Sequence, residues 1–157
     1  MSIHVELDSG EVRRRLGEVI ARVSDARPLM RAIAGILEAE TEKNFADEGR
    51  PHWAPLAKST EKARMRRNNG SSVLKILQDS GRLAASISTD YGPDHAKIGS
   101  NVVYAAIHQF GGTAGNVTIP SRPYLPFSGP PASATLQPSA ERSIIDTLKK
   151  PLNGTTN

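Results

Sequence analysis

His108 is the residue of this chain best suited to catalysis, because an imidazole is the usual general base near neutral pH. A general base needs a nucleophile to activate and a carboxylate to orient it. Ser100, Asp90 and Asp94 lie within sequence reach of His108, yet none of them occupies a nucleophile elbow or another known catalytic spacing. The pattern therefore favours a structural histidine that bonds the backbone at a helix end over the alternative, a hydrolase centred on His108.

The residue types that bind metals or phosphates do not occur at the spacings that such sites need. The chain has no cysteine, and its 4 histidines show neither an i, i+4 pair nor a carboxylate at ligand spacing. The glycine-rich run at 111–115 lacks the lysine and the helix that follow a phosphate-binding loop. We therefore predict no enzyme activity, no metal site and no cofactor.

Basic residues gather in the segment 58–67, where five cations stand against the single acid Glu61. In a nucleic-acid-binding module they would neutralise phosphates, but no aromatics interleave for base stacking and no groove-reading motif is present. A solvated helix face, or a face that meets an acidic partner, is the favoured interpretation. The net charge of +4 and the pI of about 9.6 do not by themselves argue for nucleic acid. The cations are Lys58, Lys62, Arg64, Arg66 and Arg67.

Two features suggest contacts between copies of the chain. Trp53, the only tryptophan, lies between two prolines and either folds back on the core or inserts into a neighbour, where tryptophan is enriched at binding hot spots. An acidic cluster ahead of the basic segment offers a partner for that segment on an adjacent copy. Its members are Glu38, Glu40, Glu42, Asp47 and Glu48.

Apolar periodicity and turn residues divide the chain into short elements. Proline and glycine interrupt regular structure through 47–58, and Gly92, Pro93 and Asp94 join two strands in a hairpin. Gly111 and Gly112 end a short helix. We predict strands at 3–7, 87–91, 96–99 and 117–119, and helices at 12–23, 29–45, 58–67, 104–110 and 139–150. The last region before the final helix, 120–138, is rich in proline and is predicted to be an extended connector.

This order of elements predicts an α+β fold, with a small antiparallel sheet packed by two to four helices and extended Pro-rich arms. A hydrophobic content of 38% and a mean hydropathy of −0.38 indicate a small core that neighbouring subunits complete. The 157 residues fit a single domain. Within 1–157 we expect a flexible basic arm or loop at 46–80, a Pro-rich connector at 128–138 and a loose tail at 151–157.

The chain carries no sign of a membrane or secretory destination. No apolar run approaches the roughly 20 residues of a membrane span, and the first residues lack the charged start and apolar middle of a signal peptide. Without cysteine there can be no disulfides. We expect a cytoplasmic product that makes no membrane contact.

The stretch 102–127 holds four of the chain's seven aromatics, and its residues form part of a longer succession of motifs. The succession resembles the phage virion morphogenesis family, the tail-completion proteins of Mu-like and P2-like tailed phages. The resemblance covers about 30–127. The order is specific, whereas each piece alone is weak: Phe45, then GRPHWAPL at 49–56, then SGRL at 80–83, then YAAIHQFG at 104–111, then IPSRPYL at 119–125.

The resemblance implies a non-enzymatic virion protein that completes the tail or joins head to tail, as a homo-oligomeric ring around the DNA channel. Its implied partners are further copies of itself, adjacent neck or tail proteins and DNA passing without sequence-specific contact. It would occur in the host cytoplasm during assembly and then in the virion. Under this reading Tyr104, Ile107 and Phe110 pack the short helix on the sheet, Gly111 ends it, and 120–127 forms an arm or edge offered to neighbours. The fold-signature or subunit-interface residues are Trp53, Tyr104, His108, Phe110, Gly111, Arg122, Pro123 and Tyr124.

Overall fold

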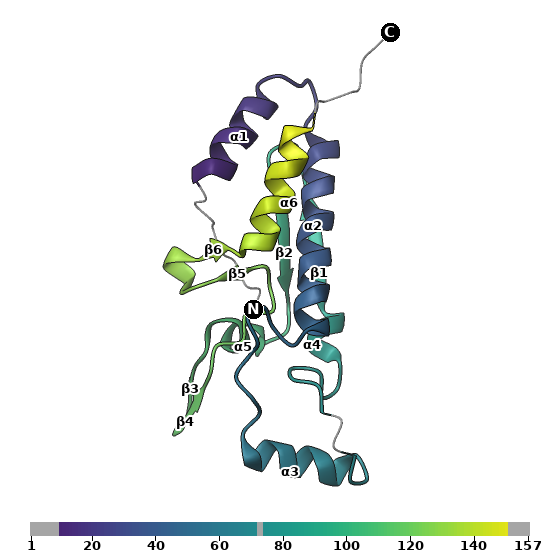
Figure 1. The fold of residues 1–157 in the computed structure, drawn as a ribbon, viewed down its shortest axis with the longest axis vertical. Coiled ribbons are helices and arrows are strands. Elements are labelled where there is room, and N and C mark those ends of the chain that lie inside the picture. Colours follow the sequence, from purple (N-terminus) through teal and green to yellow (C-terminus); the bar gives the residue numbers. More distant parts are fainter. Residues whose placement is uncertain (1–9, 72–73, 151–157) are drawn as a thin grey trace.

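Helices and short antiparallel hairpins make up the fold in the computed structural model, which describes residues 10–71 and 74–150 (Figure 1). The α+β class predicted from the sequence is confirmed, but the strands form three separate two-stranded sheets instead of one small sheet. The helices are α1 (Gly10–Ile20), α2 (Arg27–Ala46), α3 (Lys58–Arg67), α4 (Arg82–Ala85), α5 (Ala105–Phe110) and α6 (Pro138–Lys149). The strands are β1 (Ile87–Tyr91), β2 (Ala96–Ser100), β3 (Gly112–Ala114), β4 (Val117–Ile119), β5 (Phe127–Ser128) and β6 (Thr135–Leu136).

The helix α2 is the longest helix of the described chain, and α6 and the β1–β2 hairpin pack against it. It starts where the sequence favours a start, because Pro28 suits the first turn of a helix and the Asp25 carboxylate accepts the Arg27 N–H at 3.0 Å. At one end of the elongated structure, α6 lies between α1 and the first half of α2 (Figure 1). These helices bury an aliphatic cluster, defined as Ala26, Met30, Ile33, Leu37, Leu136, Ala140, Ile144 and Leu148.

The β1–β2 hairpin runs along α2. Its register pairs Ile87 with Ser100 and Tyr91 with Ala96, as the predicted turn at 92–94 requires. The hairpin was predicted correctly because turn residues separate its two short strands. Ile98 packs against the aliphatic cluster and also against a second one, so the hairpin links the two ends of the core.

The second cluster lies beyond the C-terminal half of α2 and is rich in aromatic residues. We call it the aromatic cluster and define it as Phe45, Trp53, Leu83, Val102, Ala105, Tyr124, Leu125 and Phe127. Its members come from five separate parts of the chain, whereas helices supply nearly all of the aliphatic cluster.

The expectation that 120–127 forms an arm or edge offered to neighbours is wrong, because residues 124–127 are buried. Tyr124 and Leu125 are both 0% exposed, and β5 and β6 pair with each other around a short 3-10 helix, Pro131–Ser133. The prolines of this region are compatible with burial because they fix the backbone without requiring a hydrogen-bond partner for an N–H.

The predicted helices at 12–23, 29–45, 58–67, 104–110 and 139–150 and the strand at 117–119 are confirmed to within a few residues. The predicted strand at 3–7 and the tail at 151–157 lie outside the described residues. Among the residues that are described, no helix combines the length and apolarity needed to cross a membrane.

Candidate functional site

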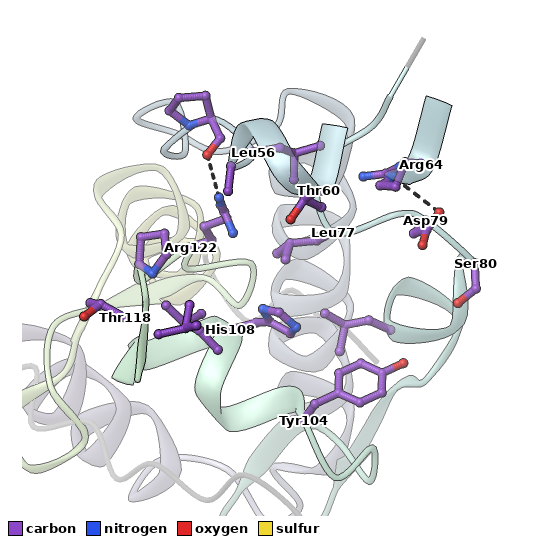
Figure 2. Close-up of a pocket in the computed structure, with 16 residues that line it drawn as sticks. Leu56, Thr60, Arg64, Leu77, Asp79, Ser80, Tyr104, His108, Thr118 and Arg122 are labelled. Carbon is purple, nitrogen blue, oxygen red and sulfur yellow. Dashed lines mark hydrogen bonds and ion pairs between the residues drawn. The ribbon is translucent and has the colours of Figure 1, made fainter. Parts of the chain in front are cut away.

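A cavity of about 700 Å³ opens between the start of α3, the helix α5 and the strand β4 (Figure 2). We call it the cationic pocket. Its walls are largely aliphatic, and two arginines, one histidine and one carboxylate reach it. The lining residues are Pro55, Leu56, Ala57, Thr60, Arg64, Leu77, Asp79, Ser80, Leu83, Tyr104, His108, Val117, Thr118, Ile119, Pro120 and Arg122.

The helix α5 contributes both to this pocket and to the aromatic cluster, and Leu83 also belongs to both. One side of α5 buries Ala105 and Gln109, and another side presents Tyr104 and His108 to the pocket. Tyr104 does not pack the helix onto a sheet as expected, since it is 38% exposed and lines the pocket, whereas Phe110 is half-buried.

Gly111 ends α5 as predicted. Its φ of 74° lies in the region that favours glycine, and a Cβ there would come within 2.8 Å of the Ser121 nitrogen and 2.9 Å of the Ile119 oxygen. The glycine thus allows the chain after β4 to pass close to the end of the helix, where the Arg122 N–H donates to the His108 carbonyl at 2.8 Å.

Buried amides hold the chain that returns past α5. The Gln109 Nε2 donates to the Phe127 carbonyl at 2.8 Å, while its Oε1 accepts the N–H groups of Tyr124 at 3.1 Å and Leu125 at 3.0 Å. From the other side, the Asn44 Nδ2 donates to the Tyr124 carbonyl at 3.0 Å. The segment 124–127 is thereby fixed between α2 and α5.

Trp53 folds back on the core and is 6% exposed. Its ring meets the Phe45 ring edge-on at a centroid distance of 5.9 Å, and its indole N–H donates to the Pro123 carbonyl at 3.0 Å. In the opposite direction, Arg122 donates hydrogen bonds from Nε to the Ala54 carbonyl at 2.9 Å and from Nη2 to the Pro55 carbonyl at 2.8 Å. Trp53, Arg122 and Pro123 thus join two segments that are about 70 residues apart in the sequence.

Positive charge exceeds negative charge at the cationic pocket. Arg64 is 4% exposed, and its Nε lies 3.2 Å from an Asp79 oxygen whose partner oxygen accepts Arg67 at 2.7 Å. Two guanidinium groups therefore share one carboxylate. Arg122 bonds only carbonyl groups among the described residues, so no carboxylate balances its charge.

The nucleophile and the carboxylate that a general base would need do not lie with His108 among the described residues. Burial, together with the positive charge of Arg122, lowers its pKa, and its buried Nδ1 has no hydrogen-bond partner within the described chain. Its ring contacts the Tyr104 ring edge-on at 5.8 Å. Of its possible helpers, Ser100 is buried against Ser86 at 2.6 Å.

The two carboxylates considered with His108 also lie elsewhere. Asp94 and Asp90 face His95, at 2.9 Å and 3.9 Å, on the β1–β2 hairpin. The structure therefore does not bring together the hydrolase set considered from the sequence. Across 10–71 and 74–150, no three histidine or acidic side chains gather as a metal site would need.

The predicted basic helix exists, but its cations are not equivalent. Lys58, Lys62, Arg66 and Arg67 are exposed on α3, whereas Arg64 points inward to the cationic pocket. Lys58 also contacts Glu61 at 3.2 Å.

The acidic cluster that was offered as a partner on a neighbouring copy is partly used within the chain. Glu40 is 2% exposed and bonds Arg50 at 2.7 Å, and Glu48 accepts the Ile76 N–H at 2.6 Å. The prediction that these two carboxylates meet a second copy is therefore wrong. Glu38, Glu42 and Asp47 remain exposed.

Comparison with known proteins accounts for the motifs that surround this pocket. The sequence profile of the phage virion morphogenesis family matches residues 7–153. The chain belongs to this family. The match extends on both sides of the region, about 30–127, in which the motifs were noticed. A role in phage virion morphogenesis follows.

Individual relatives from the family span nearly the same length. The Mu-like prophage FluMu G protein 2 of Haemophilus influenzae is 34% identical over 151 residues, which cover 94% of each chain. A protein of Escherichia phage Mu, provisionally named capsid assembly protein G, is 33% identical over 158 residues, or 96% of this chain and 94% of the relative. FluMu G protein 1 is 34% identical over 128 residues, covering 80% of this chain and 84% of its own. No solved structure gives a significant match.

The most important polar residue that the sequence analysis missed is Asn44. It is 0% exposed and donates both to the Tyr124 carbonyl and to the Gln137 Oε1, at 3.0 Å and 2.9 Å. A signal was present, because Asn44 lies seven residues after Leu37 and so falls on the apolar face of α2. A polar residue at a core position must have a buried partner.

Proposed function

We propose that this member of the family is a structural component of a tailed-phage virion that completes the tail or joins it to the head. In this proposal several copies form a ring at the neck or tail end, around the channel through which DNA passes. The protein would act in the host cytoplasm during assembly and remain in the virion afterwards.

One observation carries the proposal: the polar residues of the family-like motifs are used to hold the chain together. Trp53, Gln109 and Arg122 each bond backbone groups of distant segments, and none of them is presented as a reactive group. Such a scaffold supports surfaces for assembly rather than a chemical step. The relative from phage Mu, whose provisional name refers to capsid assembly, agrees with such a role.

The cationic pocket supports a role in binding other virion proteins. Its apolar walls and its excess of guanidinium groups suit a partner that brings both an apolar and a negatively charged side chain. In the proposal these partners are further copies of the chain and the adjacent neck or tail proteins.

Native mass spectrometry of the purified chain tests ring formation. We expect a closed oligomer with one dominant number of copies, because a contact between two different surfaces closes into a ring when its rotation allows. A chain that stays monomeric at every concentration tested would contradict the ring. An open series of lengths would contradict it as well.

A second candidate function, contact with DNA through α3, rests on the exposed cations of that helix. Lys62 and Arg66 would then touch phosphates as DNA passes, with no sequence preference. Binding of short duplex DNA that weakens steeply with salt, and that is reduced when both residues are changed to glutamine, would support this function. Binding that is unchanged in the double variant would exclude it.

A further inference from the structure

The cationic pocket has a complementary surface on the same molecule, at the tip of the β1–β2 hairpin. Tyr91 is 42% exposed, and the carboxylates of Asp90 and Asp94 are 73% and 82% exposed. The tip therefore offers an aromatic ring flanked by negative charge, which complements the aliphatic walls and the excess of guanidinium groups of the pocket.

Exposed apolar side chains point to the same pair of surfaces. Among the described residues, four large apolar side chains are exposed: Tyr91, Val103, Tyr104 and Val117. Two of these, Tyr104 and Val117, line the cationic pocket, and Tyr91 is at the hairpin tip. A contact between the two surfaces would cover three of the four.

The electrostatics of the pocket are also complementary to the tip. Arg64 and Arg67 share Asp79, and Arg122 has no carboxylate partner among the described residues. Arg122 is 7% exposed, and this burial lowers the pKa of its guanidinium. A carboxylate placed in the pocket would balance that charge at short range.

A single chain cannot bring its own tip to its own pocket. The hairpin turn lies beside the start of α2, where Pro93 lines a depression with Ala26 and Arg27. The elements α3, α5 and β4, whose residues line the pocket, lie beyond the other end of α2 (Figure 1). The 20 residues of α2 span about 30 Å. Any contact between the two surfaces must therefore join different copies.

We propose that the cationic pocket receives the β1–β2 hairpin tip of the next copy, with Tyr91 against the apolar wall and Asp90 or Asp94 facing Arg64 and Arg122. The volume of about 700 Å³ is large enough for these side chains. The contact uses a different surface on each partner, which is the kind of interface that builds a ring. This inference rests on the proposed function and names the contact through which the ring would form.

The absence of cysteine from the chain makes a direct cross-linking test possible. Pro93→Cys puts a thiol at the exposed hairpin turn, and Val117→Cys puts one at the pocket rim, where the side chain is 63% exposed. The two variants are purified separately, mixed and mildly oxidised. Ala39→Cys on the exposed side of α2 replaces Pro93→Cys in the control mixture.

We expect the disulfide between the Pro93→Cys and Val117→Cys chains to form about tenfold faster or more than in the control mixture, because docking raises the effective thiol concentration into the millimolar range. Equal rates in the two mixtures would overturn the proposal. Circular dichroism of each variant confirms that the fold is retained, so that a slow reaction cannot be assigned to unfolding.

A charge test separates the proposed recognition from chance proximity. Adding Asp90→Asn and Asp94→Asn to the Pro93→Cys chain should slow cross-linking severalfold, whereas Asp146→Asn on exposed α6 should leave the rate unchanged. A rate that is unaffected by the hairpin changes would overturn the role of the carboxylates.

Native mass spectrometry of the unmodified chain keeps the two proposals apart. A closed oligomer without preferential cross-linking would remove the hairpin contact and leave the ring intact. Preferential cross-linking in a protein that is absent from virions would leave the contact intact and remove the proposed function.

Discussion

The two clusters of the core are built on different physical principles. The aliphatic cluster at one end of α2 comes mainly from helix faces that repeat at helical spacing, such as those of Leu37 and Ile144, with Leu136 added from β6. The aromatic cluster at the other end joins segments of irregular chain, and buried amides supply the hydrogen bonds that these segments lack. The comparison indicates that close packing of apolar side chains stabilises the first cluster, while the second also depends on hydrogen bonds between buried polar groups.

The largest expected effect belongs to Gln109→Leu. The substitution nearly keeps the volume but removes the partners of the Phe127 carbonyl and of the Tyr124 and Leu125 N–H groups. Each buried group left unpaired costs about 1–3 kcal/mol, so the loss of three partners should lower the free energy of unfolding by roughly 3–9 kcal/mol. Urea denaturation followed by circular dichroism measures the loss.

The matched change in the aliphatic cluster is Leu37→Met, which also nearly conserves volume. It should cost less than about 1.5 kcal/mol, because Leu37 makes no polar contact through its side chain. If Gln109→Leu were as mild as Leu37→Met, the distinction between the two clusters would fail.

Ile144→Ala should have the next largest effect. Ile144 is 3% exposed on α6, and its truncation leaves a cavity that costs about 2–5 kcal/mol. Ile144→Val, which removes a single methyl group, should cost only about 0.5–1.5 kcal/mol. The ratio of the two losses, measured by thermal and urea denaturation, shows whether the cluster is as tightly packed as its burial indicates; two small losses would show that it is not.

A smaller effect is expected from acid. Burial opposes ionisation of Glu40, but hydrogen bonds from Arg50, Lys43 and Ser139 outweigh it and lower the pKa of this carboxyl below its ordinary value of 4.5. Because the pKa is lower in the folded than in the unfolded chain, the ionised Glu40 stabilises the fold at pH values above its ordinary pKa of 4.5. That contribution is lost as pH falls through the lowered pKa.

Urea denaturation at a series of pH values from neutral down to strongly acidic measures this loss. Glu40→Gln should flatten the acid limb of the stability profile, whereas Glu42→Gln, at an exposed position on the same helix, should leave it unchanged. An acid limb that is identical in the wild type and in Glu40→Gln would contradict the assignment.

The smallest effect is expected on the outer side of α3. Lys62→Gln and Arg66→Gln change exposed side chains and should alter the free energy of unfolding by less than about 0.5 kcal/mol. Arg64→Gln on the same helix should cost clearly more, because Arg64 is buried and the substitution removes its ion pair with Asp79. Equal stabilities for all three variants would show that the inward position of Arg64 has no energetic consequence.

Sequence reasoning was successful where local periodicity decides the structure. Apolar spacing in α2 and α6, the turn residues of the β1–β2 hairpin and Gly111 at the end of α5 each act within a few neighbouring residues. The α+β class and the family followed from such local patterns and from the order of the motifs.

The aromatic cluster was much harder to predict, because its geometry depends on pairs of residues that are far apart in the sequence. The bonds from Trp53 to Pro123 and from Asn44 to Tyr124 span 70 and 80 residues. Proline in the segment 120–127 indicated an exposed arm, whereas hydrogen bonds from Gln109 and Asn44 hold its second half, 124–127, in the core. The partner of a buried amide cannot be read from local spacing.

Immunogold labelling of purified virions tests the central claim most directly. Antibodies raised against the folded protein should label the head–tail junction or the end of the tail, with several copies in each particle. Virions that carry the protein at neither position, while the host cell lysate contains it, would contradict the proposal that it is a structural part of the virion.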